Sequence, residues 1–383
     1  MKIGVLYPRS KAHPGMLADF ADGIKAAVKH HQLNNDVELI SESIGFGGNE
    51  KEVYEKAEKI LILEEADILV AYIDQRVISI LEPLLHANGK LMIVINPGAN
   101  YPENWIPQPN IISLTLQHSF LCWLSGLLAA KNNAVGAAMA TSFYDAGYLH
   151  IAAITKSFIN NGGNIRYNYV NNSLYNETFE ITPLIDFLSA DKETENLLCV
   201  LDASPASLFY DRLNKYEESG RLHLYVSPMM LEQQAWKANG DGFNFSVEGY
   251  LPYHGAANDK TNIEFRNIFM AQTKREASLF ALQGWETGLV IQEVLNNCKD
   301  YYTDGASVAD HLATTVITSP RGELKLDKDT HFFIAPACKG IIKKNTEDLL
   351  ITLADNVKEQ WEKFVTNPLT GPSSGWTNTY LCY

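Results

Sequence analysis

Short apolar runs alternate with amphipathic stretches along the chain, most regularly in its first third. Residues 68–73 and 91–96 are almost continuously apolar, which is typical of strands buried on both faces of a parallel sheet. Residues 16–32 instead repeat apolar side chains at helical spacing, with Phe20 and Ile24 on one face. This order of strands and helices predicts an α/β fold in which helices flank a parallel sheet.

The alternation starts again near residue 117, so we expect a second lobe of the same architecture. The predicted strands are residues 3–7, 37–43, 68–73, 91–96, 134–140, 164–170, 197–201 and 222–227. The predicted helices are residues 16–32, 49–64, 77–87, 117–131, 148–161, 182–190 and 205–219. The remaining pattern indicates an extended stretch at 243–253, helices at 261–273, 279–297 and 308–315, a hairpin-like segment at 319–333 and a helix at 346–364.

Length and composition are those of an ordinary globular protein with more than one domain. At about 150 residues per domain, 383 residues predict two or three folding units. The 46% of hydrophobic residues suffices for a large core. A formal charge of −14 would repel phosphate backbones and anionic lipid, so we expect neither nucleic acid nor a membrane surface among the partners.

The cysteines, the apolar runs and the N-terminal residues bear on the cellular compartment of the protein. The five cysteines form no CxxC pair and are odd in number, which argues against a zinc ribbon or a disulfide framework. The longest apolar run, residues 120–130, is well short of the roughly 20 residues that cross a bilayer, so no membrane insertion is expected. The chain opens as MKIGVLYP without a cleavable apolar region, so a signal peptide was either removed or never present.

Enzyme motifs do not appear in the sequence. GxxxxGK[ST], HExxH and GxSxG are missing, and GFGGNE at residues 45–50 lacks the last glycine of GxGxxG. The ten histidines show no metal-ligand spacing. We therefore expect no enzymatic activity, no cofactor and no metal site.

Several segments together resemble one known family. They are IGVLYP at the start, then ADILVAYIDQ, LMIVINPGANYPEN, TSFYDAGY, GYLPYHG, FALQGWETGLVIQEVL and SPRGELKLD. In this order the chain resembles, nearly end to end, the type I periplasmic binding proteins, specifically the branched-chain amino acid (Leu/Ile/Val) receptor group of ABC-transporter solute-binding proteins.

The resemblance implies two Rossmann-like lobes joined by three crossovers. The N-terminal lobe would comprise residues 1–116 and 252–318, and the C-terminal lobe residues 117–251 and 319–383. The crossovers would fall near residues 114–118, 248–253 and 319–334.

The implied function is that of an extracytoplasmic solute-binding protein. It would trap a small amino-acid-like or carboxylated or amide ligand in the interlobe cleft by hinge closure, and would present the closed form to the membrane permease subunits of an ABC transporter. The alternative is a cytoplasmic ligand-sensing regulator of the same fold, which the lack of a signal peptide in the given chain would favour. The upstream residues encoded in the gene would separate the two.

Candidate ligand-binding residues follow from the fold, because open parallel sheets bind ligands at the carboxyl ends of their strands and at helix N-termini. In the first lobe they are Arg9, Ser10, Asp74, Gln75, Arg76, Gly98, Asn100 and Tyr101. In the second lobe and the second crossover they are Ser142, Tyr144, Asp202, Ser204, Met229 and Tyr253. The alternatives are helix capping for the loop residues and core packing for Tyr253.

The resemblance also implies a division of roles for an α-amino acid ligand. Hydroxyls and backbone donors of the first lobe would hold the carboxylate, while an aromatic residue and an acid of the second lobe would meet the ligand body and the ammonium. Tyr144 matches the aromatic position, and Asn100 stands where a hydroxyl residue is usual. Met229 stands where the acid is expected, so the ammonium lacks a partner unless another acid substitutes, namely Asp202, Asp145 or Glu232.

Two arginines are candidate partners for a carboxylate of the ligand. Arg9 and Arg76 can each grip a carboxylate with a bidentate fork, the alternative being a surface salt bridge. We therefore expect an aromatic or keto acid to compete with leucine. For Glu286, within the apolar segment 279–297, contact with the cleft and capping of a neighbouring loop both stay open.

Overall fold

The computed structural model describes residues 1–11, 13–102, 104–132, 136–142, 149–171, 179–237 and 242–367. These residues form two units. Unit 1 joins Met1–Leu116 to Tyr253–Pro336, and unit 2 joins Gln117–Pro252 to the described residues from Ala337 onward. The described chain therefore passes between the units three times.

The sheet of unit 1 is parallel throughout and has the order β2-β1-β3-β4-β5. Its strands are β1 (Lys2–Tyr7), β2 (Glu38–Ser43), β3 (Ile68–Tyr72), β4 (Leu91–Asn96) and β5 (Ile111–Thr115). Every residue of β3, β4 and β5 is buried, as their continuous apolar runs predicted.

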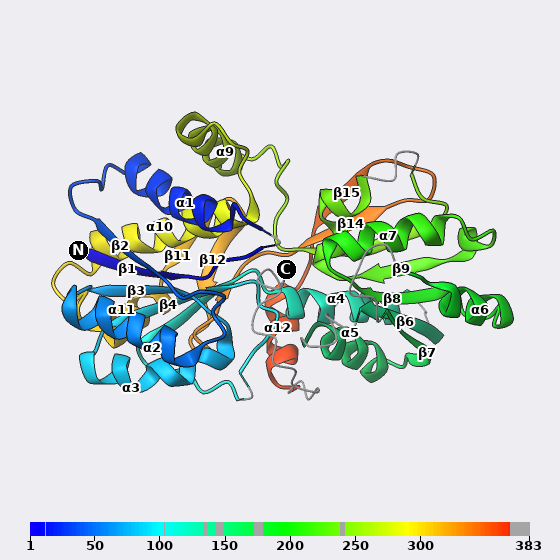
Figure 1. The fold of residues 1–383 in the computed structure, drawn as a ribbon, viewed down its shortest axis with the longest axis horizontal. Helices are drawn as coiled ribbons and strands as arrows, with labels where there is room; N and C mark the ends of the chain where they lie inside the picture. The colour runs from blue at the N-terminus through cyan, green and yellow to red at the C-terminus, as the bar shows by residue number, and fades with distance from the viewer. Residues whose placement is uncertain are drawn as a thin grey trace. The chain divides into compact units, whose positions relative to one another are not determined.

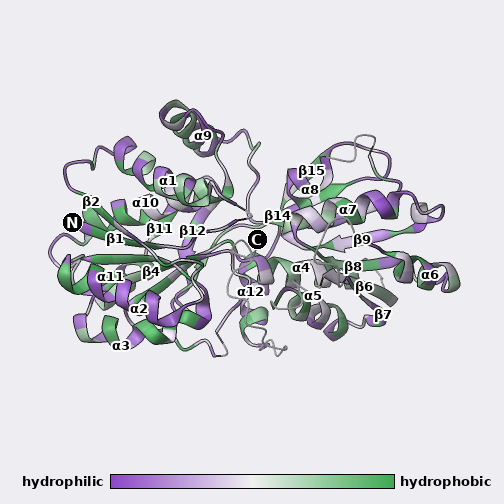
Figure 2. Cartoon of the chain, in the orientation of Figure 1, coloured by the Kyte–Doolittle hydropathy of each residue, from purple (hydrophilic) through white to green (hydrophobic). Residues whose placement is uncertain are grey.

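Helices cover both faces of this sheet (Figure 1). The core on one face includes α1 (Met16–His30), α9 (Lys260–Thr273), α10 (Leu279–Asn297) and α11 (Gly305–Ala313). The core on the other face includes α2 (Glu50–Glu58), a π-helical turn (Lys59–Leu63) and α3 (Ile78–Asn88). Alternate strand residues belong to the two cores, and Figure 2 shows the mainly hydrophobic colouring of β1 and β4 between helices of mixed character.

Helices α1 and α10 approach each other closely because glycine lies on both sides of their contact. A Cβ atom at Gly284 would lie 2.0 Å from the carbonyl oxygen of Phe20, and one at Gly23 would lie 2.3 Å from that of Ala281. Backbone atoms cannot swing aside as a side chain does. The spacing of the two helices therefore depends on these glycines.

An antiparallel sheet completes unit 1. It consists of β11 (Val316–Ser319), β12 (Gly322–Leu326) and β13 (Phe333–Ile334). The hairpin-like reading of residues 319–333 agrees with this sheet, but the chain returns to unit 2 at Ala337 rather than at residue 319. The reason is burial: Leu324, Leu326 and Phe333 belong to the core of unit 1.

Unit 2 contains a mixed sheet with the order β15-β14-β10-β9-β8-β6-β7. Its strands are β6 (Gly136–Ser142), β7 (Asn164–Asn171), β8 (Asn196–Val200), β9 (His223–Val226), β10 (Ser246–Leu251), β14 (Cys338–Ile342) and β15 (Leu349–Leu353). Its helices are α4 (His118–Lys131), α5 (Leu149–Asn160), α6 (Thr182–Ala190), α7 (Ala203–Asn214), α8 (Gln233–Trp236) and α12 (Val357–Val365). Strands β6 to β10 are parallel, whereas β14 is antiparallel to β10 and to β15.

The helix predicted over residues 346–364 is wrong in its first half. Leu349–Leu353 forms the edge strand β15, and α12 begins only at Val357. The five residues LLITL pair with β14, where Ile351 lies opposite Gly340. Antiparallel pairing with the preceding strand thus decides the conformation of a short apolar run that is compatible with either structure.

Replacing Gly284 by alanine should destabilise unit 1. The added methyl group meets the backbone of α1, so we expect the free energy of unfolding to fall by about 1–3 kcal/mol despite the better helix propensity of alanine. Gly48→Ala is the matched control, since its Cβ would meet nothing within 4 Å. Urea denaturation followed by circular dichroism measures both, and equal stability of the two variants would contradict the packing argument.

Candidate functional site

Asp74 organises a polar cluster at the carboxyl end of β3. It caps a 3-10 helix, Gln75–Val77, by accepting a hydrogen bond from the backbone N of Arg76 at 3.0 Å. The same Oδ1 accepts from Arg76 Nε at 3.0 Å, and Oδ2 accepts from Asn100 Nδ2 at 2.8 Å. Three residues predicted separately from the loops after β3 and β4 therefore lie together.

Burial and the neighbouring groups have opposite effects on the pKa of Asp74. Asp74 is only 4% exposed, and burial raises the pKa of its carboxyl group, while Arg76 and the hydrogen bond from Asn100 lower it. Arg76 keeps 31% of its side chain exposed. The cluster thus combines a buried carboxylate with an arginine whose side chain is partly exposed, and the two charges cancel.

A second layer of polar residues holds the two loops. Asn96, the last residue of β4, donates to the carbonyl of Ile73 at 3.0 Å and accepts from the N of Gly98 at 2.8 Å. Gly98 has φ +74°, a left-handed conformation that glycine adopts without strain. Gln283 of α10 donates to the carbonyl of Asn96 at 3.0 Å and accepts from Tyr72 Oη at 3.1 Å.

The sequence analysis missed Gln283, whereas Asn96 opens the loop of residues 96–101 that was predicted as a ligand site. Asn96 has a local signal, because it ends an apolar strand and precedes Pro97 and Gly98. Gln283 gave none, since it lies 187 residues from the carbonyl that it binds. Only the return of α10 to unit 1 brings it beneath the loop.

The other candidates of unit 1 have separate surroundings. Gln75 is buried and donates to Ser113 Oγ at 3.1 Å. Tyr101 is buried beside Trp105 and Phe332, with ring centroids 5.2 and 5.4 Å away. In the loop after β1, Arg9 is exposed, and Ser10 Oγ accepts a hydrogen bond from the N of His13 at 3.0 Å.

In unit 2 the candidates lie at the carboxyl ends of parallel strands. Ser142 ends β6 and is buried, and Asp202 follows β8, where its carbonyl accepts from the N of Ala206 at 2.8 Å. Ser204 is exposed in the first turn of α7. Met229 lies in the 3-10 helix Pro228–Leu231 after β9 and is fully buried. Tyr144 and Asp145 lie outside the described residues.

Two residues weighed as candidates make buried bonds within unit 1. Tyr253 belongs to the core, and its hydroxyl donates to Asn262 Oδ1. Glu286 is fully buried and receives two hydrogen bonds from Arg321, at 2.9 and 2.7 Å. Arg321 carried no signal in the sequence beyond its place in a charged turn.

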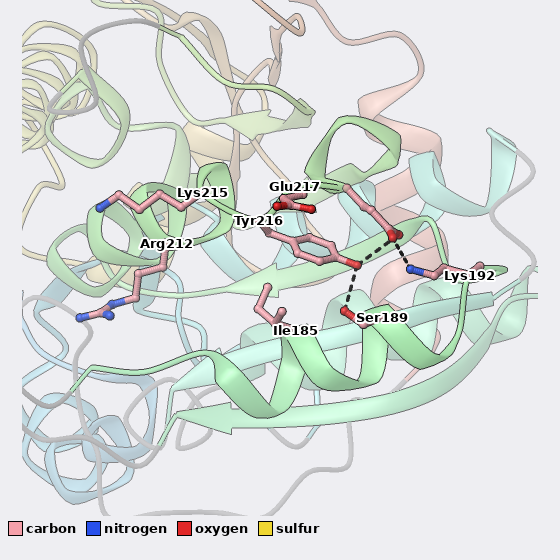
Figure 3. A pocket seen from close by; sticks show the side chains of 8 residues that line it. Ile185, Ser189, Lys192, Arg212, Lys215, Tyr216 and Glu217 are labelled. Atoms are coloured by element: carbon pink, nitrogen blue, oxygen red, sulfur yellow. Dashed lines mark hydrogen bonds and ion pairs between the residues drawn. The ribbon is translucent and has the colours of Figure 1, made fainter.

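A pocket of about 420 Å³ lies elsewhere on unit 2, between α6 and α7 (Figure 3). Along one side, Tyr216 Oη donates to Glu218 at 3.3 Å and accepts from Ser189 at 3.2 Å, and Glu218 pairs with Lys192. Ser189 lies in the last turn of α6, and the other three residues follow the ends of α6 and α7, which lead into the amino ends of β8 and β9. The pocket therefore lies at the amino ends of the strands, whereas Ser142 and Asp202 lie at the carboxyl ends.

Among the residues that the structure describes, no group of three or more His, Cys, Asp or Glu side chains could hold a metal ion. No helix in the same residues has the length and apolar character that a membrane span requires.

Comparison with known proteins identifies the family. The model of the periplasmic binding protein family matches residues 1–342, so the chain belongs to this family. No curated relative matches the sequence.

Solved structures with this fold come from several bacteria. A substrate-binding protein of an ABC transporter from Sphaerobacter thermophilus has a TM-score of 0.76 at 16% identity, over 92% of this chain and 96% of its own. A solute-binding protein from R. palustris in complex with benzoate has a TM-score of 0.69 at 18% identity, over 93% and 98%. The leucine-binding protein LivK from Thermotoga maritima has a TM-score of 0.66 at 13% identity, over 94% and 99%. At these identities the likeness confirms the α/β fold.

Replacing Asp74 by asparagine should change how the stability of the protein depends on pH, because it removes a buried carboxyl group. Because the folded pKa is raised above the ordinary 3.8, the folded state holds the proton more tightly than the unfolded chain. The stability due to Asp74 is complete below pH 3.8 and is lost as the pH rises through the folded pKa. We expect the stability of the wild type relative to Asp74→Asn to fall over this window, by at most about 1.4 kcal/mol per pH unit.

Asp304→Asn is the control of opposite sign. Its hydrogen bonds with Ser307 lower the pKa of the exposed Asp304 carboxyl, so its contribution is lost as the pH falls. Denaturation series at several pH values compare the two variants. If the stability difference between the wild type and the variant rises with pH for both variants, then the charge of Arg76 rather than burial determines the pKa of Asp74.

Proposed function

We propose that this protein is the extracytoplasmic solute-binding component of an ABC transporter. In this proposal a small ligand is held by strand-end residues of both units, and the units close about a hinge before a membrane permease receives the ligand. The observation that supports it most is the family match over residues 1–342. The polar cluster of Asp74, Arg76 and Asn100 at the carboxyl end of a parallel sheet adds to this support.

The ligand class that we propose is a carboxylated molecule with a flat or apolar body. The R. palustris structure contains benzoate, whereas the T. maritima protein is a leucine-binding protein. Met229 is apolar at the position where an acid would meet an ammonium group, and a charge-assisted bond is worth roughly 1.5–3 kcal/mol. Without it an amino acid binds about ten- to a hundredfold more weakly.

Arg76 is the proposed carboxylate partner in unit 1. Its side chain is partly exposed, while Asp74 accepts a hydrogen bond from its Nε and is itself held by Asn100. Arginine presents a planar fork that matches a carboxylate in two hydrogen bonds. Tyr144 is proposed to cover the ligand body from unit 2, as the sequence resemblance implies.

Calorimetry with benzoate and leucine tests the ligand class. We expect benzoate to compete with leucine, and Arg76→Gln to weaken benzoate binding by about tenfold or more, since a charge-assisted bond is lost. Arg275→Gln, which alters an exposed arginine of unit 1, should leave the affinity unchanged. Tyr144→Ala should cost more affinity than Met229→Leu, a volume-conserving change in a buried position.

One result would overturn this assignment. If leucine binds tightly, and if esterifying its carboxylate and acetylating its amine abolish binding equally, an acid supplies the ammonium site. Asp202 and Asp145 would then be the residues to replace.

Small-angle scattering tests hinge closure separately. A ligand that touches both units shifts the population only by its preference for the closed state, so saturation should lower the radius of gyration. Binding without compaction of an open free protein would contradict the trapping mechanism. Fractionation of cells that express the full gene tests the proposed extracytoplasmic location.

A further inference from the structure

Glu286 and Arg321 form a buried ion pair inside unit 1. Their side chains are 0% and 1% exposed. Arg321 donates from Nε to Oε1 at 2.9 Å and from Nη2 to Oε2 at 2.7 Å, so the fork is bidentate. Ser319 Oγ donates to the same Oε1 at 2.9 Å and accepts from the N of Arg321 at 3.0 Å.

The pair also binds the end of β5. Arg321 Nη1 donates to the carbonyl of Thr115 at 3.1 Å, and Thr115 is fully buried. The chain leaves unit 1 after Leu116, the next residue. The first connection between the units therefore starts from a carbonyl that this arginine holds.

The unit 1 ends of the other two connections belong to the same hydrophobic core as α10, which contains both Tyr253 and Ala335. Tyr253, the first residue after the second connection, belongs to the core that contains α10. Burial raises the pKa of its phenol, Arg266 lowers it, and the Glu286 carboxylate is close enough to raise it further. Arg321 lies in the turn between β11 and β12, and β13, which pairs with β12, ends two residues before the third connection at Pro336.

The connections themselves have distinctive backbones. Gln117, the first residue of unit 2, has φ +60°, an uncommon left-handed conformation for a residue with a side chain. Pro252 and Pro336 end the segments next to the second and third boundaries. Proline fixes its own φ, so rotation there falls on the neighbouring residues.

Stability alone does not explain such a pair. A buried ion pair loses its hydration, and well-packed apolar residues of similar volume are often as stable or more stable. What an apolar pair cannot do is hold three separate segments, at Glu286, Thr115 and Ser319, by directed hydrogen bonds.

We propose that Glu286 and Arg321 are positioning residues that hold the unit 1 ends of the three connections as one rigid block. Bending then takes place in the connections rather than within unit 1. The functional role of this rigid block rests on the proposed hinge closure. Its rigidity, however, is a property of the ligand-free protein and is tested without ligand. Failure of the proposed function would thus leave this inference standing, and the reverse also holds.

Amide hydrogen exchange of the ligand-free protein measures how rigid this block is. In the double variant Glu286→Leu/Arg321→Met, which replaces both charges by apolar groups, we expect peptides over residues 113–117, 253–257 and 319–324 to lose protection together, by about tenfold or more. Strand β8 of unit 2 should not change. Arg275→Gln is the matched control, because it breaks exposed ion pairs of unit 1 with Asp19 and Asp22.

Spin-label distances separate positioning from mere stability. Labels on Lys25→Cys and Lys215→Cys, in a Cys382→Ser background, report one residue of each unit, and the four other cysteines are buried. We expect a broader distance distribution in the double variant than in the wild type. A purely structural role would lower the denaturation midpoint and leave this distribution unchanged.

Arg321→Lys provides a second variant, should the double variant not fold. Its single ammonium keeps the charge but cannot form the fork to Glu286 while also binding Thr115. We expect smaller losses of protection in the same three segments. The inference is overturned if either folded variant keeps wild-type protection in those segments, or if the distance distribution stays as narrow as in the wild type.

Discussion

The fold of unit 1 depends on the contact of α10 with the sheet and with α1. Gly284 allows the backbones of α1 and α10 to meet, and this brings the next turns of α10 deep into an apolar layer. Gln283 and Glu286 are polar residues of this helix, and both are fully buried. Each must find a partner at that depth, because an unpaired buried polar group costs free energy. Gln283 finds one in the loop after β4, and Glu286 in Arg321.

The sequence pattern predicted the layers well and the polar linkages poorly. Fully buried strands such as β3 and β4 have a strong local signature, and so does the helical spacing of α1. The edge strand β15 was assigned to a helix because no strand was predicted at residues 338–342, where its partner β14 lies. Arg321 was not singled out because turn residues are usually solvated. Asp74, Arg76 and Asn100 were predicted as loop residues, but only the structure shows which of their atoms form hydrogen bonds.

The polar cluster at β3 has little net charge of its own. Its acid and its base neutralise each other, and an amide completes the acid's hydrogen bonds. Such a site does not attract an ion over long distances, since opposite charges in contact produce a weak field. In a protein with a formal charge of −14, recognition of an anion would therefore depend on short-range geometry rather than on electrostatic steering.

The interleaving of the chain between the units has a consequence for biosynthesis. Unit 1 needs α10 and β12, and unit 2 needs β14 and β15, whose last residue is Leu353. The first 116 residues need core partners more than 130 positions away, so unit 1 cannot complete its core until β13 has been synthesised. Unit 2 likewise needs β15, in contrast to chains whose domains are contiguous and fold one after another during synthesis.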